Sequence, residues 1–236
     1  MTKKFFLQDS YAQILNANII DSGPGWFHCD QTIFYARSGG QPGDQGWVTI
    51  DEVEYEVADT IYEPDRQTIR HVLQDDSISL EINTDIQQRI DWDRRHRLMR
   101  MHTAMHLLCS IIPAPVTGGG VGESESRVEF DIQTTDFDKQ SITDQLNQLI
   151  KSEQPVVIGE ITDEQLDAQP DLVRTMSVQP PRGLGSVRMI NIGNKIDYQP
   201  CGGTHVRNIS EIGEVLLSSI KSKGKQNKRF VIKLID

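Results

Sequence analysis

The chain has 236 residues, which is enough for one large or two small hydrophobic cores, and we expect two domains. Its formal charge of −10 argues against a general nucleic-acid binder, so any contact with polyphosphate must use local basic patches. Three scattered cysteines argue against a disulfide framework, and no apolar run reaches membrane-spanning length, so we expect a cytoplasmic protein with no membrane contact and no obligate protein partner.

Short strand-like runs follow one another through residues 1–88. They are rich in Val, Ile, Tyr and Phe, and turns separate them, notably at positions 23–25 and at Gly39 and Gly40. This spacing predicts a small, mostly antiparallel β-barrel as the first domain. The strands are expected at Ile14–Ile20, Trp26–Tyr35, Trp47–Ile50, Tyr55–Tyr62, Thr68–Leu73 and Ile78–Ile82.

The pattern changes near Asp91, at the start of the expected second domain, residues 89–236. From there to Ile112 no glycine or proline interrupts a predicted helix, and Pro113 ends it. Apolar periodicity predicts further helices over Phe137–Ser152 and Asp163–Ala168. Helices mixed with strands in this way predict an α+β domain. The strands are expected at Val128–Ile132, Val156–Ile161, Val187–Ile192, Val215–Ile220 and Phe230–Ile235.

Four residues of metal-ligating type occur in two pairs. The stretch PCGGTHV carries Cys201 and His205 with two glycines between them, and both side chains are good zinc ligands. His102 and His106 lie four residues apart on the predicted helix, so their imidazoles share one face. Each pair alone is weak evidence, because such spacings are common without a metal. Together they predict one zinc site with four protein ligands.

Other residues suit this site less well. Cys109 falls on the same helical face as His106 and could compete as a ligand, but it follows two leucines and is more simply a small buried residue. Position 103 is threonine, so the H-E-x-x-H pattern of zinc peptidases is absent. That leaves hydrolysis of a bond more labile than an amide, or no catalysis. Four residues lack a partner at ligand spacing and are interpreted as structural or exposed: Cys29, His28, His71 and His96.

Three motifs resemble the editing domain of alanyl-tRNA synthetases and its free-standing relatives, the AlaX proteins. They are FYARSGGQPGDQG (Phe34–Gly46), HTAMHLL and CGGTHV, which stand in the family's order and extend over nearly the whole chain. The approach to the second ligand pair, SVRMINIGNKIDYQPCGGTH, is similar too, with Asp197 four residues before Cys201. A complete synthetase would also need a class II aminoacylation domain, which 236 residues cannot hold.

The resemblance implies a free-standing editing protein of the medium-length AlaX type, with a barrel and an editing domain similar to that of threonyl-tRNA synthetase. It implies an ATP-independent aminoacyl-tRNA deacylase, an ester hydrolase that removes serine, and also glycine, from mischarged tRNA(Ala). Four protein ligands close a zinc tetrahedron, which is the pattern of structural zinc, whereas catalytic zinc keeps an open position. The sequence does not decide whether the ion takes part in catalysis or only holds the pocket.

Thr103 stands between the two helical histidines. A site that accepts serine must exclude correctly attached alanine, and the Thr103 hydroxyl could do so by pairing with the serine hydroxyl. An ordinary helix threonine that bonds its own backbone is an equally good interpretation.

Two basic clusters stand out against the acidic total. The arginines between positions 94 and 100 are interpreted as a solvated helix face. The second cluster, KSKGKQNKR, surrounds a predicted turn at Gly224 and Asn227 and could present its cations to a tRNA acceptor stem. Gly39 and Gly40 suit either a turn or close contact with a ligand, and the resemblance favours contact with tRNA. The candidate tRNA-binding cations are Lys221, Lys223, Lys225, Lys228 and Arg229.

Two alternative functions are compatible with the same residues. The first is editing of Ser-tRNA(Thr), because the editing domain of threonyl-tRNA synthetase resembles this chain in its ligand pattern. The second is a non-catalytic RNA-binding module in which a closed zinc site only braces the fold.

Overall fold

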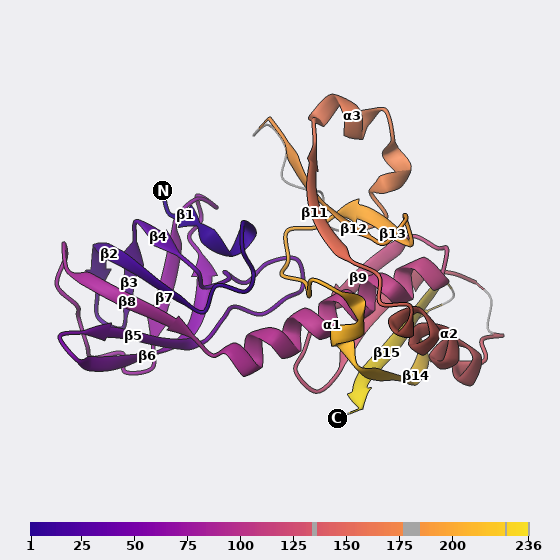
Figure 1. Ribbon diagram of the computed structural model, residues 1–236, viewed down its shortest axis with the longest axis horizontal. Coiled ribbons are helices and arrows are strands. Elements are labelled where there is room, and N and C mark those ends of the chain that lie inside the picture. Colours follow the sequence, from indigo (N-terminus) through magenta and orange to yellow (C-terminus); the bar gives the residue numbers. More distant parts are fainter. Residues whose placement is uncertain (134–135, 177–184, 225, 236) are drawn as a thin grey trace. The chain divides into compact units, whose positions relative to one another are not determined.

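The computed structural model of the protein describes residues 1–133, 136–176, 185–224 and 226–235 (Figure 1). The chain forms two compact units, Met1–Arg97 and Leu98–Asp236. The boundary falls within helix α1 (Trp92–Ile111). Each unit buries a hydrophobic core of its own.

Six antiparallel strands close the first unit into a barrel, in the order β2-β3-β7-β6-β5-β8. Pairing of β8 with β2 completes the ring, and Ile19, Phe27 and Val57 point into it with no exposed surface. This arrangement confirms the predicted small antiparallel barrel, which has no free sheet edge among these strands. The strands are β2 (Ile14–Gly23), β3 (Trp26–Cys29), β5 (Gly46–Ile50), β6 (Val53–Tyr62), β7 (Ile69–Leu73) and β8 (Asp85–Ile90).

A short N-terminal segment packs onto this barrel. Strand β1 (Lys3–Lys4) pairs in parallel with β4 (Gln31–Thr32). The 3₁₀ turn Phe5–Leu7 follows it and buries Phe6 completely. The ring of Phe6 meets that of Tyr35 edge to face with 5.3 Å between centroids, a favoured aromatic geometry.

The prediction of a strand at Ile78–Ile82 was wrong. The Asp75 carboxylate accepts hydrogen bonds from the backbone N–H and the hydroxyl of Ser77 (2.9 and 2.6 Å), which fixes a turn just before this run. Within the run Leu80 is buried in the barrel core, while Ile82 is half exposed. The apolar residues of this run therefore provide anchoring contacts to the core rather than a sheet ladder.

The strand that completes the barrel is instead the polar segment β8, which the apolar pattern did not indicate. Its Gln88 is fully buried, and its side-chain oxygen accepts from the Thr32 hydroxyl (3.1 Å) and the Ile33 N–H (3.0 Å). Because its hydrogen bonds are made inside the barrel, a glutamine can occupy a core-facing position there.

Arg95 corrects the interpretation of the first basic cluster as a solvated face. The Arg95 side chain has no exposed surface and pairs with the buried carboxylate of Asp44, to which its Nε also donates at 2.9 Å. Its remaining donors reach the carbonyls of Ser10 (3.0 Å) and Ile33 (2.7 Å). A buried ion pair is tolerated when its hydrogen bonds are completed in this way, and the spacing of charges along a helix does not reveal such pairing.

The second unit is α+β, as predicted. Its described strands form two antiparallel sheets, one in the order β14-β15-β10-β9 and one in the order β11-β12-β13. The first contains β9 (Val116–Gly120), β10 (Ser126–Asp131), β14 (Glu214–Ser222) and β15 (Asn227–Ile235), and the second contains β11 (Val156–Ile161), β12 (Val187–Ile192) and β13 (Asp197–Pro200). Its described helices are α1 from Leu98 onward, α2 (Lys139–Lys151) and α3 (Asp163–Asp167), with 3₁₀ turns at Pro170–Leu172 and Ile209–Ile212.

Helix α2 lies beside β14 (Figure 1) and covers its edge with polar contacts. Asn147 exchanges two hydrogen bonds with the backbone of Val215 (2.9 and 3.0 Å), as a neighbouring strand would do. The Thr143 hydroxyl accepts from the Leu217 N–H (3.1 Å). The helix thus satisfies part of an edge that would otherwise be open to pairing with another strand.

The sequence located the described α-helices of this unit, α1 by its lack of glycine and proline and α2 and α3 by apolar periodicity, but it missed β9 and β13. Strand β9 carries three consecutive glycines, and β13 is only four residues long. Neither has the branched or aromatic run that signals a strand, so both form because neighbouring strands supply their hydrogen-bond partners. None of the helices in the described ranges has the length and apolar character needed to cross a membrane.

Candidate metal centre

Helix α1 presents two of the four predicted ligands. It runs for 20 residues without glycine or proline, so His102 and His106 lie one turn apart on the same side. Their ring centroids are 5.3 Å apart, and both side chains are buried. The geometry expected from the i, i+4 spacing is therefore present.

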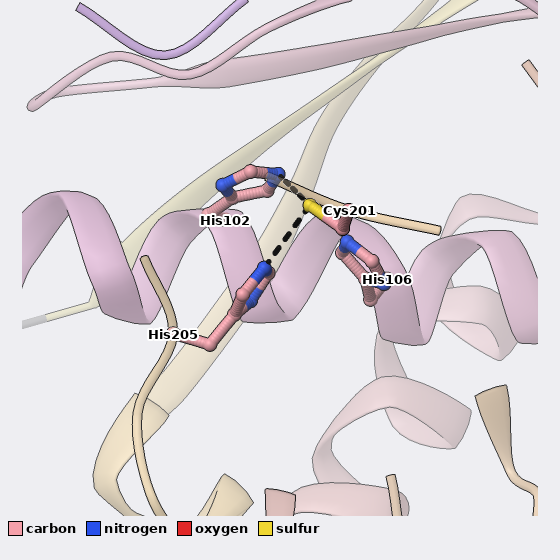
Figure 2. Close-up of side chains that lie close together, drawn as sticks. All are labelled: His102, His106, Cys201 and His205. Carbon is pink, nitrogen blue, oxygen red and sulfur yellow. Dashed lines mark hydrogen bonds between the residues drawn. The ribbon is translucent and has the colours of Figure 1, made fainter. Parts of the chain in front are cut away.

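The loop after β13 brings the second pair to the same place. The Cys201 sulfur lies 3.6 Å from His102 Nε2 and 3.3 Å from His205 Nε2. Figure 2 shows the two helical rings and the loop residues pointing toward one another. One ligand atom from each of the four residues lies within 4.8 Å of all the others, so the four could hold one metal ion.

A second layer of hydrogen bonds orients two of these rings. His106 Nδ1 donates to the buried Asp197 carboxylate at 2.7 Å, and Gln199 Nε2 donates to the same oxygen at 2.9 Å. This arrangement fixes the tautomer of His106 so that Nε2 is left for a metal, as is usual for metal-bound histidines. The sequence indicated Asp197 only by its position four residues before Cys201, and it gave no indication of Gln199.

Thr103 orients the ring of His205. Its hydroxyl donates to the Met99 carbonyl (2.8 Å) and accepts from the Val206 N–H (3.3 Å). The remaining acceptor site faces His205 Nδ1 at 3.2 Å, so that ring nitrogen is the donor and Nε2 faces Cys201. The hydroxyl is fully buried, and these three contacts use its whole hydrogen-bonding capacity.

Neighbouring groups strongly perturb the pKa values of Cys201, His205 and His106. Burial alone would favour the thiol, but the neighbouring His102 and His205 outweigh it and hold the pKa of Cys201 well below its usual range. Burial and the charge of His102 hold the pKa of His205 well below its usual range. Burial also opposes the His106 cation, but the hydrogen bonds that it donates to Asp197 and Cys201 raise its pKa to about 10. The Cys201 thiolate and the Asp197 carboxylate thus place negative charge beside the imidazoles. This charge favours a positive ion at the centre of the cluster.

The competing ligand and the remaining histidines lie outside this cluster. Cys109 is buried near the site but is not one of the four converging residues, and burial raises the pKa of its thiol to about 12. In the barrel, Cys29 is buried in the core, His28 bonds to Glu63 at 2.9 Å, and His71 stacks on Phe27. His96 lies near the rings of Tyr11 and Trp92.

The two glycines of the glycine-rich motif form a tight turn. Gly39 and Gly40 both have positive φ (53° and 82°), and Ser38 and Gln41 exchange two backbone hydrogen bonds across them. This turn by itself requires glycine-like backbone conformations. Both glycines are exposed and therefore accessible to a ligand. Their contact with tRNA stays a prediction.

The C-terminal basic cluster divides into exposed and internally bonded cations. Lys221 and Lys223 are exposed at the end of the β14–β15 hairpin, and Lys225 lies outside the described residues. Lys228 is buried and donates to the Ser222 hydroxyl (2.7 Å), while Arg229 pairs with Glu129 at 2.5 Å. The cluster therefore presents fewer exposed charges than the sequence suggests.

Two family models match separate parts of the chain, and several known proteins match nearly all of it. A family model described as "tRNA synthetases class II (A)" matches residues 8–94, and one described as "Threonyl and Alanyl tRNA synthetase second additional domain" matches residues 187–231. The chain is 30% identical over 244 residues to the alanyl-tRNA editing protein AlaX-M of Methanosarcina barkeri, with 100% of both chains covered. It is 30% identical over 233 residues to AlaX-M of Saccharolobus solfataricus, with 97% of both covered. An alanine–tRNA ligase of Metallosphaera sedula is 28% identical over 228 residues, 93% of this chain and 25% of the ligase.

We expect about one metal ion per chain, and His102→Ala and Cys201→Ala should each lose most of it, because three donors hold the ion much less tightly than four. Elemental analysis of the purified proteins measures this content and identifies the metal. Cys109→Ala is the matched control, which removes a buried thiol close by, and it should keep the metal. Full metal content in both ligand variants would contradict the assignment.

Proposed function

The chain belongs to the AlaX-M family of alanyl-tRNA editing proteins, and we propose that it is a hydrolase that deacylates mischarged tRNA(Ala) in trans at a zinc site formed by His102, His106, Cys201 and His205. The substrate we propose is Ser-tRNA(Ala), with Gly-tRNA(Ala) as a second substrate. The observation that carries the proposal is the convergence of the four ligand atoms within 4.8 Å in a chain that matches AlaX-M over its full length.

The donor set favours zinc over magnesium and calcium. Three imidazoles and one thiol, with no carboxylate among the inner atoms, are typical zinc ligands and unsuited to magnesium or calcium. With ordinary bond lengths, a tetrahedral zinc ion separates its sulfur and nitrogen ligands by roughly 3.5 Å. The observed separations of 3.3 and 3.6 Å from Cys201 are close to that value, so little rearrangement would be needed.

The chemistry required is modest, because the bond between an amino acid and tRNA is an ester. A positioned water and stabilisation of the developing oxyanion are sufficient for its hydrolysis. When bound, zinc would supply positive charge for orienting the substrate or the water. The protein's own contribution is orientation: Asp197 holds the proton on His106 Nδ1, and Thr103 accepts the one on His205 Nδ1.

The proposed substrate also implies a location. Mischarged tRNA competes for use in translation, so the protein would act in the cytoplasm, where it would need no membrane and no second protein. The reaction is hydrolytic and would run without ATP.

We expect the purified protein to release serine from Ser-tRNA(Ala) and to leave Ala-tRNA(Ala) intact. Cys201→Ala should be slower by a factor on the order of 100 or more, since a metal ion supplies several kcal/mol of charge stabilisation. Parallel reactions contain Gly-tRNA(Ala) and Ser-tRNA(Thr), and acid-precipitable label measures each rate.

The same reactions separate the alternative functions. Faster hydrolysis of Ser-tRNA(Thr) would favour threonyl editing, which the family model naming both synthetases leaves as the second candidate. Stable mischarged tRNA in every reaction, together with measurable tRNA binding, would favour the RNA-binding module.

Thr103→Val tests whether this residue reads the substrate or orients His205. Valine keeps the shape and removes the hydroxyl, whose hydrogen bonds are all made within the protein. We therefore expect similar rate losses on Ser-tRNA(Ala) and Gly-tRNA(Ala). A selective loss for serine of about 1–3 kcal/mol relative to glycine would instead support direct pairing with the serine hydroxyl.

We further propose that the β14–β15 hairpin contacts the tRNA backbone through Lys221 and Lys223. Replacing both with glutamine should weaken tRNA binding and reduce the slope of log affinity against log salt by about one unit per lost phosphate contact. Lys151→Gln with Lys195→Gln removes two exposed charges elsewhere in the same unit and serves as the control. Equal slopes for the two double variants would contradict this contact.

A further inference from the structure

The residues that follow β13 carry two of the proposed ligands without the support of a helix or strand. Residues 201–206 have no regular secondary structure, although Cys201 and His205 must be placed to within a few tenths of an ångström for tetrahedral coordination. Something other than a backbone ladder must therefore hold this loop.

Arg188 on β12 provides such a contact. Its Nη1 donates to the Cys201 carbonyl at 2.6 Å and to the Gly203 carbonyl at 3.0 Å. The Cys201 N–H in turn donates to the Arg188 carbonyl at 3.2 Å. One residue of the three-stranded sheet thus bonds both sides of the loop's first turn.

These bonds determine which backbone groups face the cluster. Both carbonyls of the turn point to the guanidinium, while the Gly203 N–H points to the Cys201 sulfur at 3.4 Å. An N–H directed at sulfur stabilises a thiolate, and a carbonyl in the same position would repel it. Arg188 therefore affects both the position of the sulfur and the sign of the dipoles around it.

We propose that Arg188 is a positioning residue for the metal centre: by binding the Cys201 and Gly203 carbonyls it holds the Cys201–His205 loop in its ligand-ready conformation and slows release of the ion. This inference rests on the metal site of the proposed function. It requires no contact between Arg188 and either the ion or the substrate.

The planar guanidinium suits this task better than an ammonium group. Its donors have fixed directions, so two carbonyls that converge on one nitrogen are held at a defined angle. A lysine at position 188 would keep the charge and could still reach one carbonyl, but it would not fix the turn. Lysine is therefore the conservative variant, and glutamine removes the charge as well.

The experiment uses the full chain loaded with zinc, as wild type, Arg188→Lys, Arg188→Gln and the control Arg127→Gln. Arg127 lies on β10 in the other sheet of the unit and is half exposed beside Glu129, so its loss removes an arginine without touching the loop. Transfer of zinc to a chromogenic chelator gives the release rate. Cobalt-loaded samples give the intensity of the thiolate-to-cobalt absorption, and thermal unfolding of the metal-free proteins gives the stability without metal.

We expect Arg188→Gln to release zinc about 10- to 100-fold faster than wild type, the range typical for loss of an outer partner of a metal ligand. Arg188→Lys should show a smaller increase together with a weaker cobalt–thiolate band, and Arg127→Gln should match wild type. Arg188→Lys should unfold near the wild-type temperature without metal, which separates a positioning role from a structural one.

Two results would overturn the inference in different ways. If wild type holds a stoichiometric ion and both Arg188 variants release it at the wild-type rate, Arg188 does not position the loop, although the metal site stands. If wild type holds no stoichiometric ion, the metal site of the proposed function fails, and the role of Arg188 fails with it.

Discussion

Burial of three imidazoles and one thiol at a single point is the constraint on which the second unit depends. Polar groups removed from water are costly unless they are paired. Here the inner atoms face one another, while outer atoms bond to Asp197 on β13 and Thr103 on α1. Helix α1 and the three-stranded sheet must therefore keep one mutual position for all these bonds to form. A bound ion would stabilise that position, and metal binding would then be coupled to the stability of this unit.

The parts of this site that the sequence predicts are those governed by local geometry. The i, i+4 spacing of His102 and His106 follows from helix periodicity, and Cys201 and His205 are recognisable by their residue types. The outer layer was largely unpredictable, because His106 and Asp197 are 91 residues apart and meet only through the fold. Arg188 stands in an apolar strand run, where nothing marks it as a partner of a loop thirteen residues later.

The barrel shows the same division between local and tertiary information. Most of its strands were predicted from short runs of branched and aromatic residues between turns. Strand β8 was not, because its buried Gln88 is compatible with the core only through partners on distant strands. Two features of the glycine-rich motif have structural roles in the barrel unit. Gly39 and Gly40 form a turn with positive φ, and Asp44 pairs with the buried Arg95. The glycines are thus explained by backbone conformation, so their presence is no evidence for RNA contact.

The charge distribution bears on how an editing protein could tell its substrates apart. The chain carries −10 overall, and in the described part of the C-terminal cluster Lys228 and Arg229 are bonded within the protein. Few phosphate contacts would give modest affinity with a shallow salt dependence, and such contacts are identical for serylated and alanylated tRNA. Under the proposed function, discrimination between serine and alanine would have to come from the pocket around the amino acid and the hydrolytic step rather than from phosphate contacts. Precise placement of Cys201 and His205 would matter more for that step than additional surface charge, because it determines how the pocket holds the aminoacyl ester.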